Sequence, residues 1–239
     1  MDPALAIALL WLAFAATHIG LSSRAVRARI VAATGPGAFA ALYSLIALAI
    51  FVPLVWLYFT HKHAGPALWV LPRGPLLSWT VYAGMGLALV LFVSSFVQPS
   101  PAGMAPASLT PHGVQRITRH PLVMSFALFA LVHLLPNGWA SDVAFFGGFV
   151  VFALAGAAHQ DRRKVAAGPN GYAGFVAATP FIPFTGRETA RGLRELSPIA
   201  ILLGLGLAVA IRYFHARWLG GNPYSIGFVG LRLTARAVV

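Results

Sequence analysis

Residues 39–59 read FAALYSLIALAIFVPLVWLYF, a run that contains no charged side chain. A helix of about 20 apolar residues crosses the roughly 30 Å hydrocarbon core of a bilayer. The whole chain shares this character, since 59% of its 239 residues are hydrophobic, 9% are charged and the mean hydropathy is +0.79. A soluble domain carries about 25% charged residues. The sequence therefore predicts an integral membrane protein and excludes a soluble enzyme, a disulfide-stapled secreted domain and a disordered chain.

Six apolar runs predict six membrane-spanning helices, the fourth of them short. They cover residues 4–22, 39–59, 77–97, 121–135, 143–158 and 198–213. The expected fold is an all-α polytopic transmembrane bundle of about six helices. Residues 168–184 are too broken by Gly and Pro for a spanning helix and too apolar for a free loop, which predicts a re-entrant or interfacial segment. We expect a transmembrane domain over residues 1–187, followed by a last helix and a C-terminal tail of unknown role over 188–239.

The basic residues lie mostly between the apolar runs. The chain has 17 Lys and Arg against 5 Asp and Glu, a net charge of +12. With the N-terminus outside, eleven basic residues lie on the inner side and six on the outer side. The positive-inside rule then predicts both termini in the periplasm, if the membrane is a bacterial inner membrane. We assign the charge to topology and to lipid headgroups of the bilayer, and not to nucleic acid.

Histidine is the main metal-ligating residue type available, because the chain has no cysteine. His18 and His133 lie within the first and fourth spans, where ionisable residues usually face the bundle interior or a cavity. Neutral imidazole suits iron, zinc or copper, but an interhelical hydrogen bond worth about 1 kcal/mol is an equal alternative for each residue. The remaining loop or helix-end histidines are interpreted as solvated or interfacial: His61, His63, His112 and His215.

Two basic clusters fall on the predicted inner face. They are Arg116, Arg119 and His120 before the fourth span, and His159, Arg162 and Arg163 at the end of the fifth. Interfacial anchoring is one interpretation. A site for a carboxylate or phosphate is the other, because guanidinium binds such anions bidentately. Asp161 is expected to pair with Arg119 or to orient His159, and Tyr172 either adds a hydroxyl to this site or belongs to the aromatic belt.

Five short motifs follow one another along residues 1–185. They are THIGLSS (17–23), RITRHP (116–121), VHLLPNG (132–138), HQDRR (159–163), and GY (171–172) with TPFIPF (179–184). Together they resemble the NnrU family, membrane proteins associated with denitrification and related to plant zeta-carotene isomerase. The resemblance implies a redox or isomerase-like protein acting on a hydrophobic substrate, or an accessory factor for a membrane reductase of nitrite or nitric oxide.

The same resemblance implies a haem b with His18 and His133 as its axial ligands. His120, His159, Tyr172 and the inner-face arginines then become candidates for propionate contacts or for support of the ligands. His133 follows His120 by about 20 Å of ideal helix, whereas His18 precedes Arg24 by about 9 Å. Helix tilt must therefore bring the two ligands to one depth, or His120 or His159 replaces His133 as the partner of His18.

Two other functional classes are compatible with these motifs. The RHP motif and the late aromatic segment also resemble membrane methyltransferases of the isoprenylcysteine carboxyl methyltransferase type. That resemblance implies S-adenosylmethionine bound by Arg119, His120, Tyr172 and residues 181–184, although HQDRR stands where that group has an acidic pair. The third class is a non-enzymatic assembly factor or transporter, in which the arginine-rich inner loop docks a partner.

Overall fold

The structure is a computed structural model that describes residues 1–103, 107–168 and 171–219. Its elements are α1 (Pro3–Ser22), α2 (Arg24–Thr34), α3 (Pro36–Thr60), α4 (Pro75–Val97), η1 (Gly113–Arg116), α5 (Pro121–Leu134), α6 (Ala140–Val165), α7 (Tyr172–Ala178), α8 (Thr189–Arg194) and α9 (Pro198–Leu219). Within this part of the chain, five helices are long and apolar enough to cross a membrane, and α5 is a shorter apolar helix. The predicted all-α transmembrane bundle is confirmed. Residues 220–239, which include most of the predicted C-terminal tail, lie outside the described residues.

Proline marks the start of most of the long helices. α1, α3, α4, α5 and α9 each begin at a proline, where the missing N–H has no helical partner to lose. All six predicted spans coincide with helices, although α6 and α9 continue to Val165 and Leu219, beyond their predicted ends. The last turn of α6 carries basic residues, which suit the negative end of a helix dipole. α6 therefore continues through its polar last turns and does not end where its apolar run ends.

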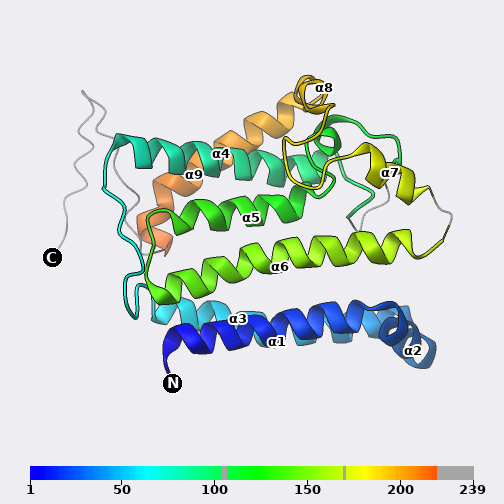
Figure 1. Cartoon of the computed structure of the whole chain (residues 1–239), viewed down its shortest axis with the longest axis horizontal. Coiled ribbons are helices and arrows are strands. Elements are labelled where there is room, and N and C mark those ends of the chain that lie inside the picture. The colour runs from blue at the N-terminus through cyan, green and yellow to red at the C-terminus, as the bar shows by residue number, and fades with distance from the viewer. Residues whose placement is uncertain (104–106, 169–170, 220–239) are drawn as a thin grey trace.

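Helix α2 was not predicted from the sequence. It is an Ala- and Arg-rich helix without buried residues, and it ends at Gly35, whose φ is +84°. Alanine and arginine are strong helix formers, and glycine adopts a positive φ without strain. Its arginines Arg24, Arg27 and Arg29 are exposed. α2 lies with α7 and α8 at one end of the bundle (Figure 1).

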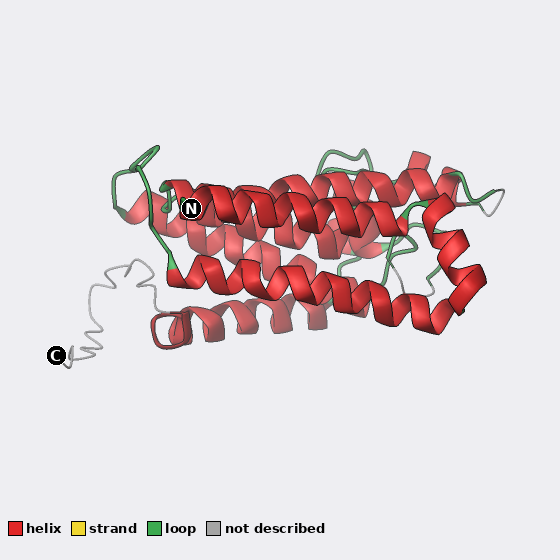
Figure 2. Ribbon diagram, turned by 90° about the horizontal axis from the view of Figure 1, so that it is seen from below, coloured by secondary structure: helices red, strands yellow, loops and turns green. Residues whose placement is uncertain are grey.

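The long helices pack in the order α3, α1, α6, α5, α4 and α9 (Figure 1). Seen from below, they run along a common direction (Figure 2). Glycine permits two of the closest approaches: a Cβ atom on Gly148 would lie 2.2 Å from Cδ1 of Trp11, and one on Gly204 would lie 2.6 Å from Cα of Val90. These contacts join α6 to α1 and α9 to α4.

The core of the first half is an aromatic cluster between α1, α3 and α6. Its buried members are Ile7, Trp11, Phe14, Leu54, Tyr58, Ala130, Phe145 and Phe146. The indole N–H of Trp11 donates to the carbonyl of Phe145 at 3.0 Å, and Tyr58 stacks on Phe145 with ring centres 3.9 Å apart. This packing fixes the faces that α6 turns toward α1 and α3.

The two ends of the bundle are chemically distinct. α1 begins and α9 ends at the same end, where Lys62 donates to the carbonyl of Leu219 at 2.8 Å. We call this the outer end, following the predicted orientation, and the opposite end, with α2, α7 and α8, the inner end (Figure 1).

Residues 171–184 form α7 and a following loop at the inner end, and Tyr172 and Phe175 are buried there. Within the described residues, this part of the predicted interfacial or re-entrant segment is a short helix and a loop packed against the bundle.

Candidate functional site

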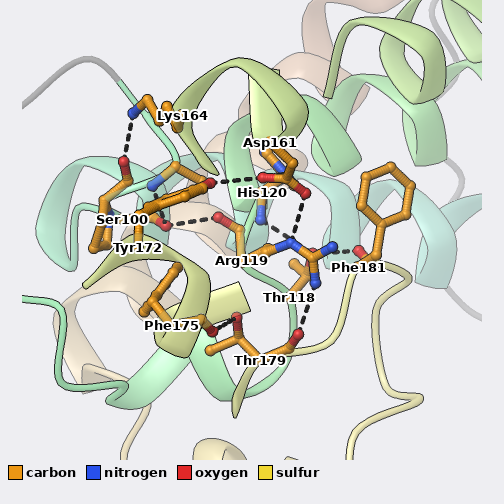
Figure 3. A network of polar contacts seen from close by, with 12 residues as sticks. Ser100, Thr118, Arg119, His120, Asp161, Lys164, Tyr172, Phe175, Thr179 and Phe181 are labelled. Carbon is orange, nitrogen blue, oxygen red and sulfur yellow. Dashed lines mark hydrogen bonds and ion pairs between the residues drawn. The ribbon is translucent and has the colours of Figure 1, made fainter. Parts of the chain in front are cut away.

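A buried carboxylate organises the inner end of the bundle. Asp161, near the end of α6, accepts hydrogen bonds from Arg119 Nε at 2.7 Å, from His120 Nε2 at 2.9 Å and from the Tyr172 hydroxyl at 2.6 Å (Figure 3). We call these four residues the Asp161 network. Of the two predicted partners of Asp161, the structure shows Arg119.

Hydrogen bonds between two segments hold this network in place. Arg119 also donates from its guanidinium to the carbonyl of Thr179 at 2.7 Å, and its backbone N–H donates to the carbonyl of Pro180 at 2.9 Å. Thr118 donates to the carbonyl of Phe181 at 2.8 Å, and the Arg119 guanidinium lies 5.1 Å from the centre of the Phe181 ring. The RHP motif and the TPFIPF motif therefore meet, although about 60 residues separate them.

The Asp161 carboxylate is satisfied by the other members of its network. The carboxylate receives three donors, and the Asp161 and His120 residues are 7% and 3% exposed. Burial, together with the hydrogen bond to Asp161, raises the pKa of the Tyr172 hydroxyl, which stays protonated as a donor. Buried polar groups that satisfy one another stabilise a unique arrangement. The residues assigned to a methyltransferase cofactor thus come together, but around a carboxylate of the chain itself.

Arg116 belongs to a second ion-pair group beside this network. Its Nε lies 3.0 Å from Glu195, and its terminal nitrogen lies 3.2 Å from Glu188. Glu195 also accepts from the backbone N–H of Gly113 at 2.9 Å and from Arg191 at 2.7 Å. The Gly113 hydrogen bond, followed by the arginine contacts, lowers the pKa of Glu195 to about 2. Arg116 therefore ties η1 to α8.

The other predicted cluster lies on the last turns of α6. Arg162 is exposed, and Arg163 places its charge near Tyr43 of α3. His159 has a buried Nε2 without a hydrogen-bond partner among the described residues. The two predicted basic clusters thus both lie at the inner end, but the structure does not gather them around one ligand site.

His18 lies in an aromatic pocket between α1, α3 and α6. Its ring centre is 5.1 Å from Phe14, 4.5 Å from Tyr43 and 5.3 Å from Phe152. The Tyr43 hydroxyl donates to the His18 carbonyl at 3.2 Å. The imidazole is therefore held by ring contacts on the side of α6 that faces α1.

His133 lies on a different side of α6, near the outer end of α5. Its Nδ1 donates to the carbonyl of Phe129 at 2.8 Å, and its ring stacks on Phe146 at 5.0 Å. Phe146 precedes Phe152, the ring beside His18, by about 9 Å of helix. Because α6 lies between α1 and α5 (Figure 1), the structure does not bring His18 and His133 together.

His133 lines a cavity of about 830 Å³ between α4, α5 and α9. Ligand pockets usually enclose about 300–1,000 Å³. The cavity wall is mainly apolar, with Met85, Leu89 and Phe92 from α4. Its residues Phe126, Leu205 and Val209 are 42%, 47% and 70% exposed on the outside of a transmembrane bundle. The cavity therefore opens toward the lipid.

Two residues of this cavity were not among the site residues predicted from the sequence. Arg212 and His215 on α9 line it together with His133, so His215 is not simply an interfacial residue. Residues three apart share one face of a helix, and an arginine within a spanning helix usually faces an interior or a cavity. That spacing was the available signal, but the position of α9 beside α4 was needed to assign the face.

A second histidine also has a buried partner, at the outer end. His63 Nδ1 lies 2.7 Å from Asp142, and the Tyr58 hydroxyl donates to the same carboxylate at 3.1 Å. The side chain of Asp142 is fully buried, whereas that of His63 is 47% exposed. This contact anchors the loop after α3 to the first turn of α6.

Comparison with known proteins identifies relatives of the chain. It is 26% identical over 187 residues to the 15-cis-zeta-carotene isomerase of Arabidopsis thaliana, covering 77% of this chain and 50% of that protein. It is also 26% identical over 190 residues to the isomerase of the same name from Zea mays, covering 74% and 48%. The chain thus spans about half the length of these two relatives. No solved structure matches it.

The motifs found in the sequence fall inside one family match. The NnrU protein family model matches residues 6–223, a range that contains the THIGLSS, RITRHP, VHLLPNG, HQDRR and TPFIPF motifs. The match extends beyond α6 and the Asp161 network to α9, which forms one wall of the cavity. This chain belongs to the NnrU family.

Proposed function

We propose that this protein is an isomerase-like membrane protein that binds an elongated apolar molecule in the cavity between α4, α5 and α9. The observation that carries the proposal is the cavity itself, which is mainly apolar, opens toward lipid and has His133 in its wall. Its relatives are named as isomerases of 15-cis-zeta-carotene, a long hydrocarbon. A substrate of this kind partitions into the bilayer, and a lipid-facing entrance suits it.

Haem b is a separate proposal, which comes from the family resemblance. We propose His133 of α5 as its ligand and not the pair of His18 and His133, since α6 contacts both α1 and α5 and separates these two helices. His133 alone fits the role of an axial ligand, since its Nδ1 donates to a carbonyl and Nε2 is left for a metal, a tautomer usual at metal sites. The Asp161 network lies at the other end of α5 from His133, so its residues are not placed for propionate contacts there.

The proposal is tested on detergent-purified protein incubated with 15-cis-zeta-carotene, with the isomers separated by chromatography. We expect binding or isomerisation by the wild type and its loss in Met85→Trp, which fills the cavity. Leu76→Trp is the control, because Leu76 lies on the same helix, is 84% exposed and does not line the cavity. Equal binding by wild type and Met85→Trp would place the ligand elsewhere.

An absorption spectrum of the same preparations, made after haem-replete expression, tests the haem proposal independently. A Soret band that is lost in His133→Ala and retained in His18→Ala assigns ligation to His133. Loss in both variants would require that the helices rearrange to bring the pair together. A wild type without the band excludes haem b as a resident group.

The remaining interpretations stay predictions from motif resemblance. S-adenosylmethionine binding is measured by calorimetry, and saturable binding that is lost in His120→Ala would favour the methyltransferase. An accessory role in denitrification, and a non-enzymatic assembly role, both predict that neither 15-cis-zeta-carotene nor S-adenosylmethionine binds. The bacterial inner membrane with a periplasmic N-terminus likewise remains a proposal for the location of this multi-pass protein.

A further inference from the structure

One face of α6 changes from apolar to basic toward the inner end. The residues on this face, in chain order, are Phe152, Gly156, His159 and Arg163. Their spacing places them on one side of the helix. Phe152 contacts the ring of His18 on α1, with ring centres 5.3 Å apart, and Arg163 places its charge near Tyr43 of α3. This face therefore turns toward α1 and α3, and not toward α5.

A second arginine approaches the same place from α2, which joins α1 to α3 at the inner end (Figure 1). The guanidinium carbon of Arg27 lies 5.4 Å from the centre of the Phe39 ring. Phe39 stacks on Tyr43, one turn later on α3, with ring centres 5.8 Å apart. Arg27 and Arg163 thus approach the two members of one aromatic pair. We call Arg27, Tyr43, His159 and Arg163 the α2–α6 cluster.

The acidic side chains of the protein are all engaged elsewhere. The sequence has five of them, and all lie in the described part of the chain. Four form ion pairs with residues outside the α2–α6 cluster, and Asp2 accepts from a backbone N–H at the start of α1. The ion pairs of the described residues include neither Arg27 nor Arg163. The cluster is therefore suited to an anion from outside the chain.

The α2–α6 cluster lies where spanning helices end. α1 ends at Ser22 and α3 begins at Pro36, so Tyr43 follows the start of α3 by about two turns. On the membrane side of the cluster, a Cβ atom on Gly156 would have one described neighbour within 4 Å, the Phe152 ring at 4.0 Å. Basic sites between spanning helices bind the headgroups of acidic phospholipids. The open space beside Gly156 suits the acyl chain of such a lipid.

We propose that the α2–α6 cluster binds one acidic phospholipid of the surrounding leaflet. Its phosphate lies at Arg27 and Arg163, and an acyl chain follows Gly156 and Phe152. Guanidinium forms paired hydrogen bonds to phosphate. His159 adds its buried Nε2, which has no hydrogen-bond partner among the described residues. This lipid site lies on the α1 side of α6, away from the cavity between α4, α5 and α9, so it does not rest on the proposed function.

The test uses the full chain in a neutral detergent, titrated with dioleoyl phosphatidylglycerol or with dioleoyl phosphatidylcholine. Native mass spectrometry counts the lipid that stays bound. We expect the wild type to retain one phosphatidylglycerol in preference to phosphatidylcholine. Arg27→Gln and Arg163→Gln should each weaken phosphatidylglycerol binding about fivefold, because one arginine near a membrane surface contributes about 1 kcal/mol. A wild type without this preference would overturn the proposal.

Arg29→Gln is the matched control for the charge. Arg29 lies on the same helix and is exposed, but its spacing of two residues from Arg27 turns it to another side of α2. It is expected to bind phosphatidylglycerol like the wild type. Equal losses in Arg27→Gln and Arg29→Gln would indicate diffuse attraction to the basic end of the bundle, and would overturn the assignment of a site.

A variant that keeps every charge tests the acyl chain. Gly156→Leu fills the space beside Phe152 and is expected to weaken phosphatidylglycerol binding. Gly147→Leu is its control, because Gly147 lies on the opposite side of α6 and also has open space at its Cβ position. Equal binding by these two variants would overturn the placement of the lipid on this face of α6.

Competition separates the lipid from other anions. Inorganic phosphate and a short polyglutamate peptide, each at the concentration of the lipid, are expected to leave phosphatidylglycerol bound. Displacement by phosphate would identify a site for the free anion, and displacement by the peptide would identify a site for an acidic protein segment. Either result would overturn the assignment to phospholipid.

Discussion

Two carboxylates at the inner end, those of Asp161 and Glu195, contribute to the stability of the fold in different ways. Asp161 is 7% exposed and accepts from three side chains of two segments, Arg119 and His120 just before α5 and Tyr172 at the start of α7. Its charge is compensated by Arg119 and by the other donors. Removal of a carboxylate of this kind leaves a buried cation and unpaired donors, and such losses dominate the energetics of buried ion pairs.

We therefore expect Asp161→Asn to lower the free energy of unfolding by about 3 kcal/mol. Reversible unfolding in mixed micelles measures this change. Glu188→Gln is the control, because Glu188 pairs with Arg116 while its side chain is 49% exposed, and an exposed pair contributes at most about 1 kcal/mol. Equal stability of the two variants would mean that the Asp161 network is dispensable for the fold.

The stabilising contribution of Glu195 depends on pH. Its pKa is lowered from 4.5 to about 2 in the folded protein by Gly113 and the neighbouring arginines. The unfolded chain therefore binds a proton more readily than the folded one. The stabilisation is complete above the unfolded pKa of 4.5 and is lost as the pH falls through about 2.

The expected result is a difference in unfolding temperature between wild type and Glu195→Gln that is constant near pH 6. This difference shrinks as the pH falls from about 5 toward 2. Thermal unfolding followed by helical circular dichroism across this pH range measures it. A difference that stays the same at low pH would show that the carboxylate charge does not contribute.

At the scale of elements, the contact of α9 with α4 forms one side of the cavity. It depends on Gly204, where a Cβ atom would lie 2.6 Å from Cα of Val90. Backbone cannot move aside as a flexible side chain does. Gly206, two residues farther along the same helix, has open space at its Cβ position within 4 Å.

Gly204→Ala is expected to push α9 away from α4, to lower the unfolding temperature and to weaken binding of 15-cis-zeta-carotene in the cavity. Gly206→Ala should be neutral or stabilising by up to about 1 kcal/mol, because alanine favours helix over glycine. Thermal unfolding and 15-cis-zeta-carotene binding, measured on the two variants, test this pair. The reverse order of effects would contradict the α4–α9 packing.

The helices themselves could be predicted, but their neighbours could not. All six spans follow from apolar runs, because a bilayer demands length and hydropathy from each segment separately. The pair of Asp161 and Arg119 was also predicted, because both residues lie at helix ends on the same predicted face of the membrane. The separation of His18 from His133 depends on α6 lying between α1 and α5. Neither hydropathy nor the order of the chain specifies which helices are neighbours. For the same reason, the cavity and the position of His215 in its wall could not be predicted from the sequence.

For the whole molecule, the arrangement of helices makes a topological prediction. Val70 lies in the loop at the outer end and is 75% exposed, whereas Leu193 lies on α8 at the inner end and is 49% exposed. The chain contains no cysteine, so each position can carry the only thiol. A membrane-impermeant maleimide is expected to label Val70→Cys in intact cells.

Leu193→Cys should react with the same reagent only after the cells are broken. The positive-inside distribution is the physical reason, because the inner end carries the larger share of the basic residues. The opposite labelling pattern would invert the molecule in its membrane and place the Asp161 network on the outer side.

The opening of the cavity toward lipid changes what a binding constant for this protein means. A ligand that enters past Phe126 and Val209 comes from the bilayer, where it already resides. The protein then responds to the mole fraction of ligand in the membrane and not to its aqueous concentration. Dilution with extra lipid or detergent at constant total ligand should lower occupancy, whereas dilution with water should leave it almost unchanged. Cells could accordingly regulate occupancy through membrane composition alone.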